Sequence, residues 1–201
     1  MKIDTVILAA GESRRLGFNK LCLRVNGKAA VRRTVELFLE NGPGGKLMVV
    51  TGFEAERIEG ELAGLSVIFV HNELYSSGMS SSVKTILPYV TEADLVLFHL
   101  GDKPFVAPEI IRNIEKCYGA DGSSIVVPVH EGVKGHPVLI NVRRYLSDAC
   151  AIKGDRGLRD VIDEHVKETF FFEGGEGVVL DMDTEEDISL LRRRGYIIEK
   201  G

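Results

Sequence analysis

The chain has 201 residues, 44% of them hydrophobic, and carries a formal net charge of −5 at pH 7. A chain of this length can bury about 70% of its unfolded surface, so we expect a single domain over residues 1–201. The acidic balance argues against a nucleic-acid-binding protein, because affinity for nucleic acid comes mostly from basic side chains that neutralise phosphates.

Residues 1–118 alternate between short β-branched apolar runs and helical patterns. The sequence predicts strands at 5–9, 47–51, 67–70 and 95–100, and helices at 29–41, 54–62, 80–87 and 108–118. This alternation is typical of an α/β fold, in which a mostly parallel central sheet carries helices on both faces. Such sheets bind ligands at the carboxyl ends of their strands.

The second half departs from this rhythm. After an expected strand at 125–129 the chain becomes rich in glycine, with a further strand around 138–141 and helices at 143–151 and 158–165. A polar turn at 154–159, GDRGLR, is either a substrate-side loop or a helix cap. We expect this half to form a wall or lid of the ligand site.

Cysteine usage and hydropathy indicate where the protein works. Cys22, Cys117 and Cys150 are an odd number without CxxC spacing, which disfavours a disulfide framework or a zinc site. Asp4 interrupts the first residues before a signal-type apolar stretch develops, and no run approaches the ~20 apolar residues that span a bilayer. We expect a soluble cytoplasmic protein with reduced thiols and no membrane partner.

The loop after the first strand is the clearest indication of a ligand. The apolar run 6–8 leads into the segment 9–20, which reads AAGESRRLGFNK. Free backbone N–H groups near Gly11, with the cations of Arg15 and Lys20, would bind a polyanion. The spacing matches neither the P-loop nor the GxGxxG of dinucleotide-binding folds, so another nucleotide fold is implied.

Carboxylates follow two of the expected strands. Asp102 comes after the strand at 95–100, and Asp181 and Asp183 come after an apolar run at 178–180 that we also expect to be a strand. Mg²⁺ takes one or two carboxylates together with substrate oxygens, so these residues predict a metal site in front of bound phosphates. The local alternatives are an Asx turn at Asp102 and a helix cap at Asp183.

Two further segments offer polar groups to a second ligand. The stretch HNELYSSGMSSSV holds Asn72 and a glycine turn before Ser80, Ser81 and Ser82, whose hydroxyls and amides either bind an anion or cap a helix. His136 lies between a glycine and a proline that restrict its direction. A purely structural role is the alternative for this histidine.

Taken in chain order, the motifs LAAGxSxRxGxxK, NxxYxxGMxxSV, GDxP, GHP, GDxG and DxDTxED resemble those of the molybdenum cofactor nucleotidyltransferases. This group contains the molybdopterin cytidylyltransferases and the molybdopterin-guanine dinucleotide synthases. The resemblance extends from Val6 to Asp187. It implies a three-layer α/β/α, Rossmann-like nucleotidyltransferase fold, and an Mg²⁺-dependent enzyme that transfers a nucleotidyl group from an NTP to the terminal phosphate of molybdopterin, releasing pyrophosphate.

The resemblance also implies roles for individual residues. Arg15 and Lys20 would hold the triphosphate, Asp102 would bind Mg²⁺, and Asp181 and Asp183 would complete or support the metal site. The nucleotide-binding set would be Leu8, Ala9, Ala10, Gly11, Arg15, Lys20, Gly101 and Asp102, and the acceptor-binding set would be Asn72, Ser80, Ser81, Ser82 and His136. The implied partners are CTP, a molybdopterin-type cofactor and a recipient molybdoenzyme.

Two positions bear on specificity. Cytidylyl members of the family typically read LAAG where guanylyl members read LAGG, so Ala10 favours CTP. Lys103 stands where the family usually has Gln after the aspartate. A lysine there would either contact phosphate or compete with Mg²⁺ for Asp102.

Other functions remain open from the sequence. The same fold serves nucleotidyltransferases that use GTP with molybdopterin, or that use a sugar phosphate, phosphocholine or methylerythritol phosphate as acceptor. A carrier that binds the cofactor without catalysis is an alternative of another class. That alternative would predict the loss of metal and phosphate ligands, whereas Arg15, Lys20, Asp102 and Asp183 are all present.

Overall fold

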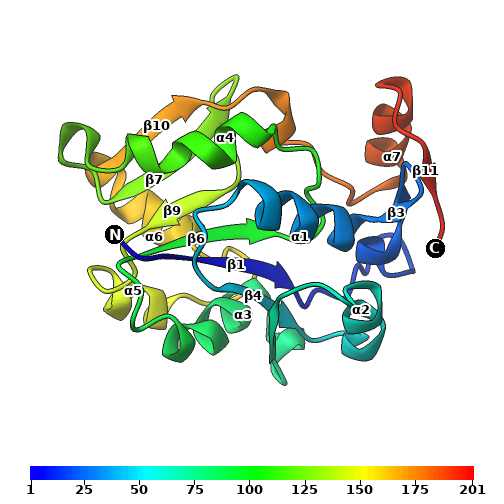
Figure 1. Ribbon diagram of the computed structural model, residues 1–201, viewed down its shortest axis with the longest axis horizontal. Coiled ribbons are helices and arrows are strands. Elements are labelled where there is room, and N and C mark those ends of the chain that lie inside the picture. Colours follow the sequence, from blue (N-terminus) through cyan, green and yellow to red (C-terminus); the bar gives the residue numbers. More distant parts are fainter.

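A central eight-stranded sheet organises the computed structural model, which describes residues 1–201 (Figure 1). The strand order is β10-β7-β9-β6-β1-β4-β5, and β8 pairs with β7 off this path. The strands are β1 (Ile3–Ala9), β4 (Leu47–Thr51), β5 (Ile68–His71), β6 (Leu95–Leu100), β7 (Ile125–His130), β8 (Val133–Lys134), β9 (Val138–Ile140) and β10 (Thr169–Glu173).

The strands of the first half are parallel to one another. Leu8 of β1 is in register with Val50 of β4 and with Leu100 of β6. The carboxyl ends of these strands therefore meet at one edge of the sheet, where the predicted ligand loops begin. In the second half, β9 runs antiparallel to both β6 and β7, and β8 runs antiparallel to β7.

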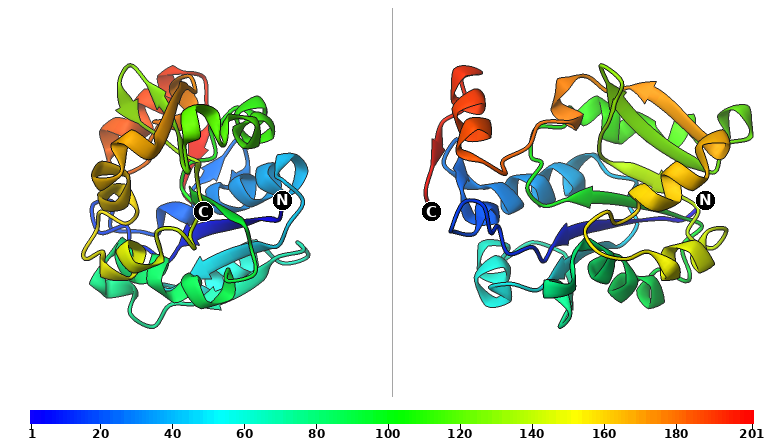
Figure 2. Two further views of the ribbon diagram at one scale, coloured as in Figure 1. Left: turned by 90° about the vertical axis from the view of Figure 1, so that its left-hand side faces the viewer. Right: turned by 180° about the vertical axis from the view of Figure 1, so that it is seen from behind.

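Helices cover both faces of the sheet, which confirms the three-layer α/β/α prediction. One face carries α1 (Ala30–Asn41), α2 (Ala55–Glu61) and α4 (Pro108–Asn113), and the other carries α3 (Met79–Ile86), α5 (Leu146–Ala151) and α6 (Arg159–Glu164). α1 and α4 lie in front of the sheet in Figure 1, and the right-hand view of Figure 2 shows the α5 and α6 region in front. Alternate strand residues feed separate apolar clusters on the two faces.

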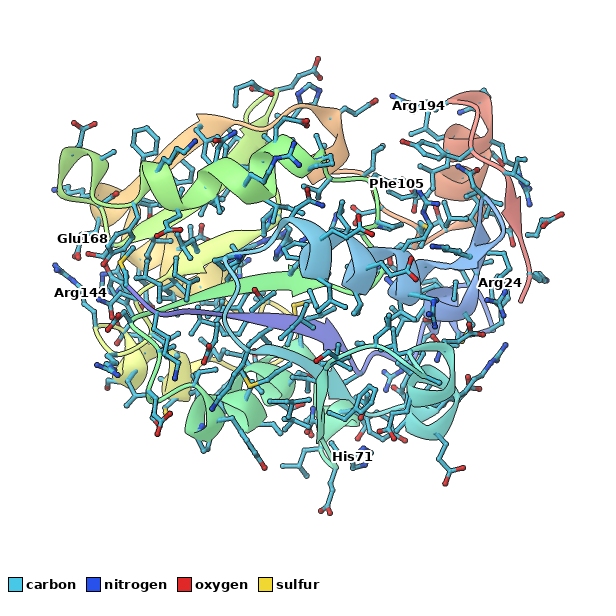
Figure 3. All side chains as sticks on the ribbon, in the orientation of Figure 1. Arg24, His71, Phe105, Arg144, Glu168 and Arg194 are labelled. Atoms are coloured by element: carbon cyan, nitrogen blue, oxygen red, sulfur yellow. The ribbon has the colours of Figure 1, made fainter.

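A second, three-stranded sheet joins the start of the chain to its end. It consists of β2 (Arg24–Val25), β3 (Lys28–Ala29) and β11 (Ile198–Glu199), and α7 (Glu185–Arg193) packs beside it (Figure 1). Phe105, labelled in Figure 3, packs against Tyr196 of this unit with ring centroids 4.8 Å apart. The unit holds residues 179–184 close to the loop after β1.

Most predicted elements are confirmed, with corrections in the second half. The predicted strand at 178–180 is wrong: Val178 ends a 3₁₀ turn, Glu176–Val178, and the chain then continues without regular structure. Val178 is apolar because its side chain is buried, not because it belongs to a strand. The strands β8 and β10 and the three-stranded sheet were not predicted. The remaining 3₁₀ turns are Lys20–Cys22, Tyr75–Ser77, Leu87–Tyr89, Ile114–Cys117, Ala120–Gly122 and Val166–Glu168.

The helices are all short or polar. None has the length and apolar character needed to cross a membrane.

Candidate functional site

A cavity of about 750 Å³ opens at the carboxyl ends of β1 and β6. Its walls come from the loop after β1, the amino-terminal end of α3, the turn after β6, and the segments 133–138, 155–162 and 179–183. The second half of the chain therefore walls the cavity, as expected. The predicted site residues that line it are Leu8, Ala9, Ala10, Gly11, Arg15, Lys20, Ser82, Asp102, His136, Asp181 and Asp183.

Lys20 is the centre of the charged cluster in this cavity. Its Nζ contacts both the Asp102 and the Asp183 carboxylates, which come from positions far apart in the chain. Arg15 adds a second cation, with its Nη2 2.7 Å from Oδ2 of Asp183. Lys20 is held in place because its backbone N–H donates to Oγ of Ser13 at 3.1 Å. The cluster thus holds two cations and two carboxylates.

The charges in this cluster stabilise one another. Burial by itself would lower the pKa of Lys20, but the charge of Asp102 and hydrogen bonds to Asp102 and Asp183 raise it above its ordinary value. Burial by itself would raise the pKa of Asp102, but the Lys20 ammonium lowers it below its ordinary value. Lys20 is therefore protonated and Asp102 ionised at neutral pH.

The helix-cap alternative for Asp183 is wrong. α7 is capped by Thr184, whose Oγ1 accepts the backbone N–H of Asp187 at 3.2 Å, while the Asp187 carboxylate accepts the N–H of Thr184 at 2.8 Å. This reciprocal capping box satisfies the first turn of the helix. The Asp183 side chain is therefore free to face Lys20.

Asp181 lies apart from the other two carboxylates. Its Oδ1 is 2.5 Å from Nζ of Lys103, the residue after Asp102. No group of three or more His, Cys, Asp or Glu side chains is close enough to hold a metal ion. Asp181 thus lies outside the pair formed by Asp102 and Asp183, whose carboxylates face one cation and could hold a divalent ion together with substrate oxygens.

The glycine loop presents open backbone to the cavity. A Cβ added at Gly11 would meet no atom within 4 Å, so a ligand can approach the main chain there. Ala10 is 4% exposed, and a Cβ on Gly52 would lie only 2.8 Å from its methyl group, so this methyl packs against Gly52. Gly101 is not part of the lining; its N–H donates to Leu8 O at 2.9 Å and links β6 to β1.

Three of the five predicted acceptor-binding residues do not line the cavity. Asn72 is 1% exposed and its amide donates to the hydroxyls of Ser81 at 2.8 Å and Ser82 at 3.0 Å. Asn72, Ser80 and Ser81 do not line the cavity, whereas Ser82 and His136 do. The structure gives Asn72 a bracing role between β5 and α3. His71, on β5 at the sheet edge, lies outside the cavity (Figure 3).

The cavity also has a basic rim formed by Lys134, Arg156 and Arg159, of which sequence reasoning missed Lys134 and named the other two only as part of the turn 154–159. Lys134 and Arg156 share Asp163, at 2.5 and 2.6 Å, whereas Arg159 makes no ion pair. Asp155, in the same turn, accepts the N–H of Met79 at 3.3 Å and so docks the turn on α3. The turn does not cap α6, the helix that follows it, since no side chain caps that helix. It lines the cavity, and a contact with substrate stays a prediction.

Fold and cavity together define a class of protein. A parallel sheet that gathers an open glycine loop, a lysine, an arginine and two carboxylates at its strand ends is a nucleotide-binding α/β enzyme suited to phosphate chemistry. The chain belongs to the MobA-like NTP transferase domain family, whose model matches residues 5–169. It is a nucleotidyltransferase of this family.

Individual relatives agree with this assignment. The chain is 27% identical, over 96% of both sequences, to the molybdenum cofactor cytidylyltransferase of Escherichia coli (strain K12). The Rv0371c homologue from Mycobacterium sp. strain JC1 superposes with a TM-score of 0.83 at 26% identity, covering 96% of this chain and 98% of that one. A manganese complex of Rv0371c from Mycobacterium tuberculosis H37Rv gives a TM-score of 0.78 at 25% identity, covering 95% and 98%.

Proposed function

We propose that this protein is a molybdenum cofactor cytidylyltransferase of the cytoplasm, which transfers CMP from CTP to the terminal phosphate of molybdopterin and releases pyrophosphate. The observation that carries the proposal is the cluster in which Lys20 lies between Asp102 and Asp183 at the mouth of the glycine loop. Similarity to the Escherichia coli enzyme over 96% of both chains supports the choice of acceptor.

The nucleotide would lie along the loop after β1. Its phosphates would meet the open backbone at Gly11 and the cations of Arg15 and Lys20. An oxygen of the acceptor phosphate attacks the α-phosphorus, and the bond from that phosphorus to the bridging oxygen breaks, so that pyrophosphate leaves with the electron pair. Because the nucleophile is already an anion, the protein chiefly aligns the reactants and offsets negative charge.

Asp102 and Asp183 would hold Mg²⁺. Bound there, the ion would neutralise charge on the phosphates during transfer. The resemblance to a mycobacterial protein whose structure contains manganese supports a divalent ion in this family. Asp181 would support the site from outside, since its carboxylate pairs with Lys103.

Ala10 supports the choice of CTP. Its methyl group packs against Gly52, directly after the last paired residues of β1 and β4, and fills space at the start of the nucleotide loop. A glycine at this position, as in guanylyl members, would leave that contact unfilled. The acceptor would bind in the part of the cavity lined by Ser82, His136 and the basic rim.

The test is Mg²⁺-dependent pyrophosphate release with freshly isolated molybdenum cofactor and each of CTP, GTP, ATP and UTP, with Asp102→Asn as the control. We expect release with CTP alone and its loss in the variant. Release with GTP instead would overturn the nucleotide assignment. Silence with all four, followed by turnover on a sugar phosphate, phosphocholine or methylerythritol phosphate, would overturn the acceptor; tight cofactor binding without any turnover would indicate a carrier.

A further inference from the structure

Lys103 is a buried cation next to the candidate metal carboxylates. Its side chain is 7% exposed, its Nζ lies 2.5 Å from Oδ1 of Asp181, and the same atom donates to Leu180 O at 3.1 Å. A buried ammonium is costly unless it is paired and hydrogen-bonded. Lys103 is therefore held by two consecutive residues of one segment, while Asp102 pairs with Lys20 instead.

The main chain of Lys103 is also anchored. Its N–H donates to Leu100 O at 3.2 Å, and its carbonyl oxygen lies 2.9 Å from Nε2 of His99, which is fully buried in β6. Because its main chain is anchored, Lys103 has a fixed position at the end of β6. Its ammonium therefore defines where Leu180 and Asp181 can lie relative to the sheet.

The segment that Lys103 holds alternates its side chains. Leu180 and Met182 are buried against α7 and the three-stranded sheet, while Asp181 and Asp183 face the cavity. Burial therefore alternates along residues 180–183, which leaves Asp181 and Asp183 on the cavity side of the segment. By pairing with Asp181, Lys103 thus fixes the segment in the position that directs the Asp183 side chain toward Lys20 and Asp102.

We propose that Lys103 is a positioning residue of the metal site, which fastens the segment 179–183 to the end of β6 and so holds Asp183 opposite Asp102. The inference rests on the proposed function, in which those two carboxylates hold the ion. It deepens that function by assigning a role to a position where the family usually has glutamine. Lys103 acts through Leu180 and Asp181 and does not contact the ion.

The direction in which Mn²⁺ affinity changes when Lys103 is replaced tests this role. Removing a positive charge beside a cation site should tighten metal binding if charge alone matters. If Lys103 positions Asp183, Lys103→Met should instead weaken binding of Mn²⁺ alone, measured by the electron paramagnetic resonance of free Mn²⁺, by about tenfold, as for other residues that orient metal ligands. Tighter or unchanged binding would overturn the proposal.

Matched variants separate positioning from general stability. Lys116→Met removes the same charge from an exposed lysine that contacts only Asn113, and should leave Mn²⁺ affinity unchanged. Asp181→Asn should weaken Mn²⁺ binding in the same direction, and the double variant should be no weaker than Lys103→Met. A lower melting temperature with unchanged Mn²⁺ affinity would show a merely structural lysine.

Two outcomes distinguish this inference from the proposed function. If Asp183→Asn and Asp102→Asn leave Mn²⁺ affinity unchanged, the proposed metal site itself is wrong. If they weaken it and Lys103→Met does not, only the positioning role fails. Should Lys103→Met not fold, Lys103→Gln decides instead, because it also removes the positive charge that pairs with Asp181: weaker Mn²⁺ binding would support the positioning role, and tighter or unchanged binding would overturn it.

Discussion

At the scale of single residues, Lys20 is the group on which the proposed chemistry most depends. It is the one cation in contact with both Asp102 and Asp183, and it would neutralise charge on the triphosphate. We expect Lys20→Ala to lower the rate of pyrophosphate release by about 10²–10³, as for removal of one preorganised electrostatic group. Lys28→Ala, which removes an exposed lysine paired with Glu36, is the control. Near-normal turnover in Lys20→Ala would remove this residue from the mechanism.

Arg159 is the unpaired member of the basic rim. If it meets the acceptor phosphate, Arg159→Ala should raise KM for the acceptor about tenfold, the effect of losing one charge-assisted hydrogen bond. KM for CTP should stay constant, because the proposed nucleotide site is the loop after β1 and does not include Arg159. Arg143→Ala is the matched control, since Arg143 donates to Thr91 O and does not line the cavity. Equal changes in both KM values would contradict an acceptor role.

His99 makes stability depend on pH. Burial lowers the pKa of its imidazole from 6.5 to about 4, so the folded protein keeps it neutral. As pH falls below 6.5 the unfolded chain takes up a proton that the folded chain does not, so stability should fall until pH reaches about 4. The slope from this group is at most about 1.4 kcal/mol per pH unit.

Urea unfolding midpoints at several pH values between 7 and 4 would measure this slope. His99→Gln removes the titrating group and should flatten the dependence of unfolding free energy on pH. The contribution of His136 would remain, because burial lowers the pKa of this histidine to about 3. An unchanged slope would show that His99 does not control acid sensitivity.

At the scale of elements, the segment before α7 contains two neighbouring residues with different expected roles: Thr184 stabilises the helix, and Asp183 would bind the metal ion. Thr184→Ala removes a helix cap and should lower the free energy of unfolding by about 1 kcal/mol, with Mn²⁺ affinity unchanged. Asp183→Asn should do the reverse, lowering Mn²⁺ affinity with little change in stability. Urea unfolding and Mn²⁺ titration of both variants test this; weakened Mn²⁺ binding in Thr184→Ala would mean that the cap also sets Asp183.

This segment also shows where sequence reasoning fails at the scale of elements. Val178, Val179 and Leu180 resemble a strand by composition, but Val178 fills a space beside Gly135 and Gly174, and Leu180 packs under α7. Burial alone explains their apolar character, and periodicity cannot separate such a short run from a strand. The strands β1, β4 and β6 were predicted correctly because each apolar run is longer, with five to seven residues, and is followed by a turn or loop.

At the scale of the whole molecule, the cavity depends on both halves of the chain. CTP with Mg²⁺ would touch the loop after β1 and the carboxylates at 102 and 183 together, so binding should stabilise the entire fold. At a concentration of 100 times Kd the gain is about 2.7 kcal/mol, which corresponds to a rise in melting temperature of roughly 5–10 °C for a chain of this size. GTP at the same concentration, and CTP with Lys20→Ala, should give smaller shifts. Equal shifts with CTP and GTP would argue against selection by the Ala10 loop.

The amino-acid sequence by itself determined the α/β class and the parallel first half of the sheet, and it predicted Lys20, Asp102 and Asp183 as site residues. These follow from local signals, because hydrophobic periodicity and strand-end motifs are written in neighbouring residues. Only the tertiary structure decided which of these residues meet. It placed Lys20 in contact with Asp102 and Asp183, and it paired Asp181 with Lys103. It also buried Asn72 between β5 and α3 and placed the basic rim on the cavity wall. Such pairings depend on contacts between distant segments, set by the packing of α7 and the three-stranded sheet, and no local pattern encodes them.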